Sequence, residues 1–423
     1  MNCTKVLSLL FFIFSLALIT ACDDDKITLF LNGIAEKKLD DVYQAASYDP
    51  DIINLAMSVE SPKQNFSWNK AGGIAYPNYR EEMTIKTPFR IASIGKTFTA
   101  TLIMKMVEAG SVSLSTPISD ILADDDMPAH FTLNELHQID GASNGESLTI
   151  NQLLNHTSGL RDYIADKPNN DTLSNSLAAR QILDLTEILP SGIAQKSWTS
   201  SSILEYFFSS DMSQYAMNAP GESYHYSDTN YVLLGLIIEK ISGMSLADNY
   251  QVEIFSQSQM NSAYLEWHEA AKGKGPAHHY ANLAPYGINE NLDIIASGFN
   301  TSFDWGGGGI VSNIEELNSY VSSLFNNKLF QDSDTLKKMQ QSIDVKDQYF
   351  SYGLGLKKKE YQLAHKTVVV YGHDGAWGGG MYYIPATGTS IVFTLNQTAP
   401  QKKDWLLEIL RGLDKAFLFT AIK

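Results

Sequence analysis

The sequence predicts a mixed α/β fold of the α+β type, in which one sheet is built from both ends of the chain and a helical region is inserted between them. Strand patterns occur at 51–60 and 65–75, and further strand candidates lie between 351 and 396. From about 116 to 303 the chain is mainly helical with long polar loops. With 423 residues, 44% of them hydrophobic, the chain can bury a large core.

The central element of this prediction is the stretch 88–110, PFRIASIGKTFTATLIMKMVEAG. Phe98, Leu102 and Met106 recur at helical spacing with other apolar residues beside them, so the helix is apolar on nearly every side. A helix of this kind is usually buried, and Gly110 can end it in a left-handed conformation. We therefore expect a buried helix whose first turn contains residues 93 and 96.

The remaining elements follow from the same periodicities. Helices are expected at 29–46 (weak), 150–159, 229–242 (strongly apolar), 314–324 and 403–419 (amphipathic). Strands in the C-terminal part are expected at 351–356, at 367–372 with 379–384, and at 390–396.

The N-terminus has the pattern of a targeting segment. Lys5 precedes an apolar run over 6–19 that is short for a membrane span, and Ala21, Cys22 and three aspartates follow. This resembles the lipobox of bacterial lipoproteins, in which such a cysteine is lipidated and becomes the mature N-terminus. The alternative is an ordinary signal peptide with a chance cysteine.

We therefore expect a lipoprotein signal peptide at 1–21, a tether and N-terminal helix at 22–50, and one domain over 51–423. The protein would be lipid-anchored at Cys22 in the bacterial cell envelope, on the outer side of the cytoplasmic membrane or at the outer membrane. The other cysteine, Cys3, would leave with the signal, so the mature body would have no disulfide, cysteine nucleophile or cysteine-ligated metal. A net charge of −16 repels phosphate backbones, which argues against a nucleic-acid partner.

Ser93 and Lys96 lie one helical turn apart, so both side chains project from one face. In a dry site the ammonium form of a lysine loses its water, and a neutral or proton-sharing amine can activate the serine as a nucleophile. The alternatives are an N-cap serine and a solvated lysine. The same pattern recurs at Ser67 and Lys70, but in a strand, where residues three apart point to opposite faces.

A second candidate group precedes the apolar helix at 229–242. Tyr226 and Asp228 stand in a turn there, and a tyrosine can exchange protons with Ser93 or a leaving group if a nearby cation stabilises its phenolate. The alternative is an N-cap behind a packed aromatic ring. The G-x-S-x-G match at 141–145 lies in a polar loop without the buried strand that a nucleophile elbow requires, and we reject it.

A third candidate group interrupts the C-terminal strands. His373, Asp374 and Gly375 lie in the glycine-rich run YGHDGAWGGGM, where a ligand can approach a strand edge closely. They could line a cleft, with the backbone N–H of Ala376 as an oxyanion donor. The alternative is a glycine-rich hairpin with a structural histidine.

Taken in order, S-I-G-K, Y-S-D and H-D-G resemble the motifs of the serine β-lactamase and penicillin-binding protein superfamily, in particular its class C-like branch. That branch includes D-alanyl-D-alanine carboxypeptidases, D-aminopeptidases and esterases. The supporting stretches are FRIASIGKTFTATLI, LLNHTSGL, YSDTNYVLLGLIIEKISG and WGGGGIVSNIEEL, and the likeness spans roughly 52–419. It implies an antiparallel sheet flanked by helices, an all-helical region, and a site between them without a metal or cofactor.

The resemblance also implies roles for individual residues. Ser93 would be the acyl-accepting nucleophile, Lys96 its proton partner, and Tyr226 the general base and then the acid to the leaving group. His373 occupies the place of the family's Lys or His in K/H-x-G. The N–H groups of Ser93 and Ala376 would form the oxyanion hole.

Two residues depart from the family pattern. Asp228 stands where asparagine is common, and an ionised carboxylate near Lys96 would keep that lysine charged and shift base duty to Tyr226. Asp374 stands where a hydroxyl often binds the substrate carboxylate, and it would repel such a carboxylate if it faced the cleft. We therefore hypothesise a substrate without a free C-terminal carboxylate, testable by comparing kcat/KM for a D-Ala-D-Ala peptide and its amide.

The functional expectation is an envelope-anchored serine hydrolase that forms an acyl-enzyme on Ser93 and acts on a small peptide, amide, ester or β-lactam. The alternatives are a D-alanyl-D-alanine carboxypeptidase or class C β-lactamase proper, and a non-catalytic relative that binds peptidoglycan or a protein.

Overall fold

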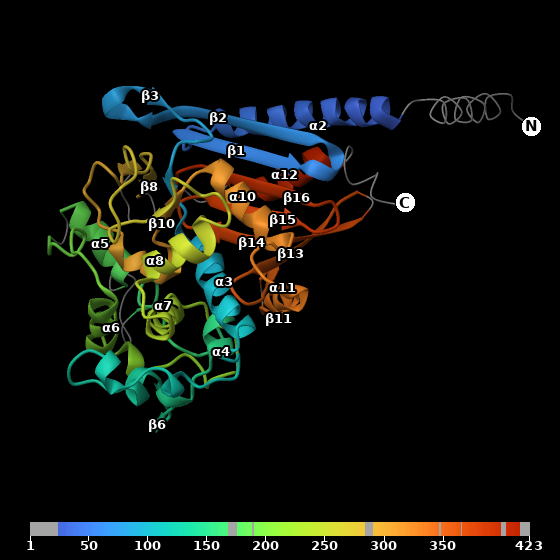
Figure 1. Cartoon of the computed structure of the whole chain (residues 1–423). Coiled ribbons are helices and arrows are strands. Elements are labelled where there is room, and N and C mark those ends of the chain that lie inside the picture. Colours follow the sequence, from blue (N-terminus) through green and yellow to red (C-terminus); the bar gives the residue numbers. More distant parts are fainter. Residues whose placement is uncertain are drawn as a thin grey trace, which may run out of the picture.

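A nine-stranded antiparallel sheet organises the molecule, in the order β11-β12-β13-β14-β15-β16-β1-β2-β3 (Figure 1). The computed structural model describes residues 24–167, 176–187, 190–283, 291–346, 348–364, 366–398 and 403–414. The strands are β1 (Asn54–Ser61), β2 (Phe66–Tyr76), β3 (Glu81–Glu82), β11 (Ile343–Asp344), β12 (Phe350–Tyr352), β13 (Lys357–Gln362), β14 (Thr367–Gly375), β15 (Gly379–Ile384) and β16 (Thr389–Thr394). N-terminal β1 pairs with C-terminal β16, so the sheet is built from both ends of the chain, as expected.

Helices cover both faces of this sheet because successive strand residues point to opposite sides. Tyr382 and Ile384 of β15 pack in one core cluster with α2 (Asp24–Ser47) and α12 (Trp405–Leu413). Met381 and Tyr383 belong to the larger core cluster, which includes α3 (Gly95–Glu108) and α10 (Ile314–Phe325). Figure 1 shows α2 lying along β1 and β2 on the outer side of the sheet.

The segment between the two halves of the sheet carries the other helices and small strands. The helices are α4 (Ile150–Leu154), α5 (Leu177–Leu185), α6 (Ser200–Ser209), α7 (Thr229–Ser242), α8 (Leu246–Tyr250), α9 (Trp305–Gly308) and, after α10, α11 (Ser333–Gln340). Three short strands, β4 (Phe89–Arg90), β7 (Tyr264–Leu265) and β10 (Ile310–Ser312), form a second sheet. Two further hairpin-like pairs are β5 (Gln138–Ile139) with β6 (Ala142–Ser143), and β8 (Tyr280–Asn282) with β9 (Asn291–Asp293).

The sequence-based elements agree best where the apolar pattern is strongest. The bounds of α7 match the prediction, and the buried part of α3 runs from Gly95 to Met104. The inserted region contains more short strands and single turns than the mainly helical segment that we expected. Strand β13 was not predicted, because its sequence KKKEYQ contains residues that are depleted in strands; pairing with β12 and β14 on either side holds it in the sheet.

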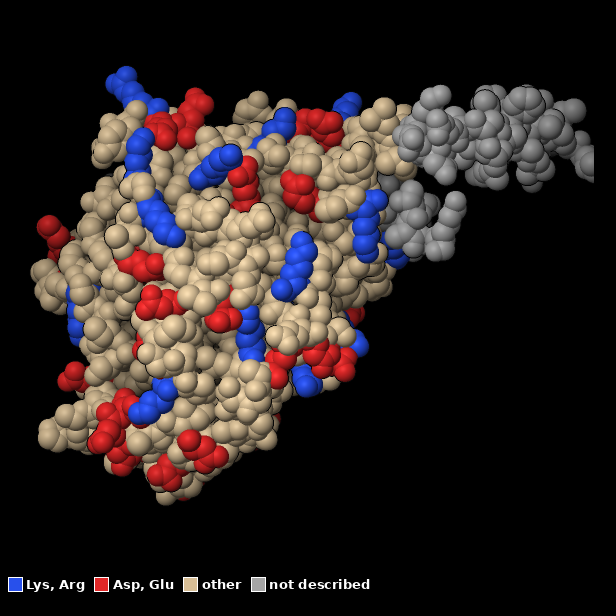
Figure 2. All heavy atoms as spheres, viewed as in Figure 1, with Lys and Arg blue, Asp and Glu red and all other residues tan. Residues whose placement is uncertain are grey.

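Within the described ranges, no single helix is long and apolar enough to cross a membrane; α7 and the segment 246–255 meet that criterion only as a pair bent by 80°. Acidic and basic side chains are interspersed over the part of the surface that Figure 2 shows in colour.

Candidate active site

The backbone around Ser93 is shaped by two consecutive elements. Strand β4 leads into a 3-10 turn, Ala92–Ile94, and α3 begins at the next residue. Ala92 has a φ of 47°, in the left-handed region that L-residues seldom adopt, so the chain turns sharply immediately before the serine. Lys96 follows in the first turn of α3, and its Nζ lies 3.2 Å from Ser93 Oγ. The predicted pairing of these two side chains is therefore present.

A run of glycines allows a second helix to approach this turn closely. A Cβ added to Gly308 of α9 would lie 2.6 Å from the carbonyl carbon of Ala92, and one added to Gly95 would lie 2.9 Å from Gly308 Cα. The carbonyl of Gly307 accepts a hydrogen bond from Lys96 Nζ at 3.0 Å. Residues larger than glycine would separate α9 from the turn that carries Ser93. The sequence analysis did not assign a role to these glycines, although four in succession at 306–309 were a visible signal.

Lys96 Nζ has three acceptors around it. They are Ser93 Oγ, the Gly307 carbonyl and Asp228 Oδ1, and the last of these contacts is an ion pair. The Lys96 side chain is 0% exposed, so no water replaces these partners. Three acceptors match the three N–H donors of an ammonium group. This arrangement suits the ammonium form, as we expected from the sequence for an ionised Asp228 carboxylate beside Lys96.

Tyr226 completes the group around the serine. Its hydroxyl is hydrogen-bonded to Ser93, and Lys96 Nζ lies 4.9 Å from the centre of its ring. Burial and the negative charge of Asp228 hold the pKa of Tyr226 well above its usual value, with the bond to Ser93 acting in the opposite direction. The structure thus brings Ser93, Lys96, Tyr226 and Asp228 together, although 135 residues separate the first from the last.

Two further carboxyl groups, which no sequence motif indicated, approach this cluster. Burial and the neighbouring Asp228 charge raise the pKa of Asp162 well above its usual value. The same two causes raise the pKa of Asp304 to about 7, against the opposing effect of Lys96.

The end of β14 forms the opposite wall of the site. Pairing between β13 and β14 stops at Gly372, so residues 373–375 extend beyond β13 on that side of β14. A Cβ added to Gly375 would collide with the carbonyl oxygen of Ile91, which shows how closely this strand end approaches the serine turn. Gly375 and Ala376 line the cleft together with Ser93, as predicted.

His373 is held inside this wall by two hydrogen bonds. Its Nδ1 lies 2.7 Å from the backbone carbonyl of Asp374, and its Nε2 lies 2.9 Å from the hydroxyl of Tyr352. The residue is 0% exposed. Burial and the charges of Lys357 and Lys96 hold the pKa of His373 well below its usual value. The ring is therefore neutral, and both of its nitrogens are engaged by protein groups.

The Asp374 carboxylate is compensated by neighbouring residues. Lys357 and Lys359 of β13 each lie 3.0 Å from one of its oxygens, and the Tyr382 hydroxyl donates to it as well. Burial alone raises the pKa of Asp374, but the two lysines and the hydroxyl bring it well below its usual value. The single negative charge of Asp374 thus faces the positive charges of Lys357 and Lys359. The repulsion of a substrate carboxylate that we expected from Asp374 loses its basis, because the sequence did not reveal the β13 lysines as partners.

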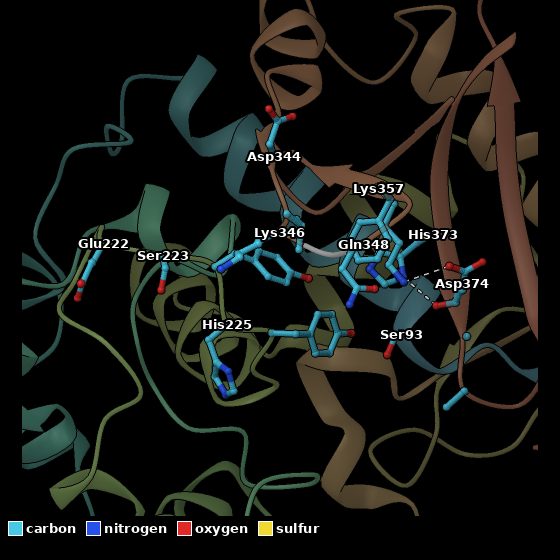
Figure 3. A pocket seen from close by; sticks show the side chains of 16 residues that line it. Ser93, Glu222, Ser223, His225, Asp344, Lys346, Gln348, Lys357, His373 and Asp374 are labelled. Atoms are coloured by element: carbon cyan, nitrogen blue, oxygen red, sulfur yellow. Dashed lines mark hydrogen bonds and ion pairs between the residues drawn. The ribbon is translucent and has the colours of Figure 1, made fainter. Parts of the chain in front are cut away.

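A cleft of about 860 Å³ is lined by residues that include Ser93, Tyr226, His373 and Asp374. Figure 3 shows Ser93, His373 and Asp374 at one end, and Glu222, Ser223 and His225 at the other. The rejected serine of the G-x-S-x-G match, Ser143, is exposed in the hairpin of β5 and β6 and does not line this cleft. In the described part of the chain, no group of three or more His, Cys, Asp or Glu residues is arranged to hold a metal ion. Cys22 lies outside the described residues.

Comparison with known proteins identifies relatives of this chain. Penicillin-binding protein 4* of Bacillus subtilis (strain 168) is 33% identical over 186 residues, which are 43% of this chain and 32% of that protein. Protein flp of Staphylococcus aureus is 27% identical over 177 residues, 42% of this chain and 28% of that protein. The matched stretch therefore spans about a third of the length of these curated relatives.

Solved structures share the fold over most of their length. The D-stereospecific amidohydrolase from Streptomyces sp. has a TM-score of 0.68 at 22% identity, with 91% of this chain and 99% of that chain covered. The D-amino acid amidase from Ochrobactrum anthropi SV3, complexed with D-phenylalanine, has a TM-score of 0.68 at 21% identity, covering 92% and 99%. EstCE1, a hydrolase with promiscuous acyltransferase activity, has a TM-score of 0.69 at 19% identity, covering 91% and 99%.

The family model described as Beta-lactamase matches residues 65–412, a range that includes every residue of the cluster around Ser93. The antiparallel sheet flanked by helices agrees with the fold that the motifs implied. The chain therefore belongs to the β-lactamase family of serine hydrolases.

Proposed function

We propose that this protein forms an acyl-enzyme on Ser93 and cleaves amide, peptide or ester bonds of small acyl donors. The observation that carries the proposal is the convergence of two proton-handling groups on one serine. Lys96 Nζ lies 3.2 Å from Ser93 Oγ, and the Tyr226 hydroxyl is hydrogen-bonded to the same oxygen. Ser93 and Tyr226 both line the cleft, so a bound carbonyl group can reach them.

The hydrogen-bond directions suggest how the proton moves. Because Lys96 donates to Ser93 Oγ, the serine hydrogen is directed to Tyr226. Oγ attacks the substrate carbonyl, its proton passes to the phenolate form of Tyr226, and the Lys96 ammonium stabilises the developing charge. Tyr226 then gives that proton to the leaving amine or alcohol as the carbonyl–heteroatom bond breaks. Water repeats the same steps on the ester of Ser93 and releases the acid.

The shape and charge of the cleft support a small substrate. Its volume of about 860 Å³ is in the range of pockets that enclose small organic ligands. Among the structures that share the fold are an amidohydrolase described as D-stereospecific and an amidase of D-amino acids, which favours amides or peptides with a D-configured residue. Compensation of Asp374 by Lys357 and Lys359 keeps acids within the proposed range, so D-alanyl-D-alanine carboxypeptidase and β-lactamase activities are the second candidates.

Covalent labelling tests the acyl-enzyme directly. The purified chain is incubated with a fluorophosphonate and with a panel of p-nitrophenyl esters, D-amino-acid amides, D-Ala-D-Ala peptides and β-lactams, and adducts are measured by intact mass. We expect one adduct per chain, lost in Ser93→Ala and retained in Ser143→Ala, the matched control at an exposed serine outside the cleft. A wild-type protein that takes up no label, or an adduct that persists in Ser93→Ala, would contradict the proposal.

A lipid anchor at Cys22 is the second part of the proposal. The apolar run over 6–19, the small Ala21 and the aspartates after the cysteine support it. Helix α2 begins at Asp24 and packs on the sheet, so a lipid on Cys22 would be joined to the folded body through this helix. Cells fed an alkyne fatty acid should label the wild-type chain and Cys3→Ser but not Cys22→Ser. Equal labelling of Cys22→Ser would refute the anchor.

A further inference from the structure

A chain of buried side chains runs behind Tyr226 and ends at His373. His156, from the segment after α4, packs its ring against Tyr226 with centroids 4.4 Å apart. Its Nε2 lies 3.3 Å from the hydroxyl of Tyr352 on β12, and that hydroxyl lies 2.9 Å from His373 Nε2. His156, Tyr352 and His373 are each 0% exposed. Buried polar groups with no access to water take their protonation from one another, so the proton positions in this chain can be deduced.

The proton on His156 is fixed by backbone and amide donors. The backbone N–H of Ser227 and the side-chain amide of Asn230 both donate to His156 Nδ1, each at 3.1 Å. The Ser227 N–H can only donate, so Nδ1 is an acceptor and the NH2 group of Asn230 is the side of its amide that faces it, with Oδ1 left to accept from the Ser158 hydroxyl at 2.6 Å. A nitrogen that accepts two hydrogen bonds carries no proton, so the neutral ring of His156 is protonated on Nε2 and donates to Tyr352.

His373, at the other end of this series of hydrogen-bonded side chains, has the opposite pattern. The Asp374 carbonyl can only accept, so His373 Nδ1 carries the proton that lies between them. Nε2 of the neutral ring is then an acceptor, and the hydroxyl of Tyr352 is the donor beside it. The Tyr352 hydroxyl also lies against that of Tyr231, but Tyr231 gives its own hydrogen to the carbonyl of Leu154 at 3.1 Å. The Tyr352 hydrogen therefore has two acceptors beside it, the Tyr231 oxygen and His373 Nε2, and an imidazole nitrogen is a stronger acceptor than a phenol oxygen.

We propose that His156 and Tyr352 are positioning residues that hold His373 as a neutral ring protonated on Nδ1, the tautomer that ties the ring to the Asp374 carbonyl at the end of β14 that extends beyond β13. In this arrangement His373 supports the strand end that carries Gly375 and Ala376, and it adds no charge to the cleft. The proposal rests on the proposed function only in assigning this strand end to the active site; the proton positions stand on the hydrogen bonds alone.

The charges around His373 make a neutral ring important. Lys96 of α3 and Lys357 of β13 face it with positive charge, Asp374 lies next to it on β14, and Tyr226 packs nearby with ring centroids 6.4 Å apart. A third positive charge here would repel both lysines, and protonation of Nε2 would end its role as acceptor from Tyr352. Burial and these lysines hold the pKa of His373 well below its usual value, which agrees with the hydrogen-bond pattern.

Nitrogen NMR of the histidine rings tests the proton positions without any substrate. The full chain labelled with ¹⁵N only in its nine histidines is assigned by His156→Asn and His373→Asn. We expect His156 protonated on Nε2 and His373 on Nδ1, both neutral at pH 7. A His373 ring protonated on Nε2, or charged at pH 7, would overturn the proposal. Because no reaction is measured, this failure is distinct from a failure of the acyl-enzyme proposal.

Tyr352→Phe tests the dependence of His373 on its donor. Removing a hydrogen bond to the neutral ring should raise the titration midpoint of His373 by about half to one pH unit. The acid limb of kcat/KM should move to higher pH together with the NMR midpoint. Tyr320→Phe is the matched control, since that phenol is also buried but is bonded to Thr101 of α3 and does not line the cleft. A midpoint that is unchanged in Tyr352→Phe, or shifted equally in Tyr320→Phe, would refute the role of Tyr352.

Discussion

Replacing Lys96 with methionine is expected to lower kcat/KM by about 10³-fold or more and to destabilise the fold at the same time. Activity falls because the ammonium no longer stabilises the charge that develops on Ser93 Oγ, 3.2 Å away. Stability falls because Asp228, whose side chain is only 9% exposed, is left as a buried carboxylate without its partner. Loss of one member of a buried ion pair costs about 3–5 kcal/mol. Hydrolysis of a p-nitrophenyl ester and urea unfolding measure the two effects.

The double variant Lys96→Met with Asp228→Asn separates the loss of activity from the loss of stability. Removing both charges takes away the unpaired carboxylate, so most of the lost unfolding free energy should return while kcat/KM stays low. Lys105→Met is the matched control, because Lys105 lies on the same helix and pairs with Glu253 at the surface, where such a pair contributes at most about 1 kcal/mol. If the double variant were as unstable as Lys96→Met, or recovered activity, the assigned role of the ion pair would be wrong.

The sequence was sufficient to predict the structure where the interacting residues lie close together along the chain. Ser93 and Lys96 share one turn, so helical spacing alone placed them together, and the unbroken apolar run 229–242 gave the bounds of α7. The order of three short motifs implied the fold, and the sheet formed from both ends of the chain confirms it. Periodicity works in these cases because the interacting residues lie within a few positions of each other.

The sequence was insufficient where a partner comes from a distant segment. The lysines that compensate Asp374 lie on a strand whose composition disfavours that structure, so neither the strand nor the ion pairs were expected. The motifs pointed to Asp228 as a neighbour of Lys96, but not to the Gly307 carbonyl that also accepts from its Nζ. No role was predicted for His156, because its hydrogen-bond partners come from α7 and β12, far from it in the sequence.

Replacing Asp228 with asparagine is expected to move the alkaline rise of kcat/KM to lower pH. In the proposed reaction Tyr226 accepts the Ser93 proton as a phenolate, so the rate follows the fraction of Tyr226 that is ionised. The negative charge of Asp228 is, after burial, the largest cause that raises the pKa of Tyr226. Asparagine has nearly the same shape without the charge, so the pKa of Tyr226 falls and more phenolate is present at a given pH. A neighbouring like charge disfavours the ionised form, so its removal lowers the pKa of Tyr226.

The pH profile of ester hydrolysis between pH 6 and 10, corrected for spontaneous hydrolysis, measures this shift, and Asp162→Asn provides the matched comparison. Asp162 also raises the pKa of Tyr226, but by less than Asp228 does, so its replacement should shift the profile by a smaller amount in the same direction. A profile that moves to higher pH in Asp228→Asn would mean that loss of the carboxylate acts mainly through Lys96 and that the lysine accepts the serine proton. An unchanged profile would show that ionisation of Tyr226 does not limit the reaction, because the charge that sets its pKa would have been removed without effect.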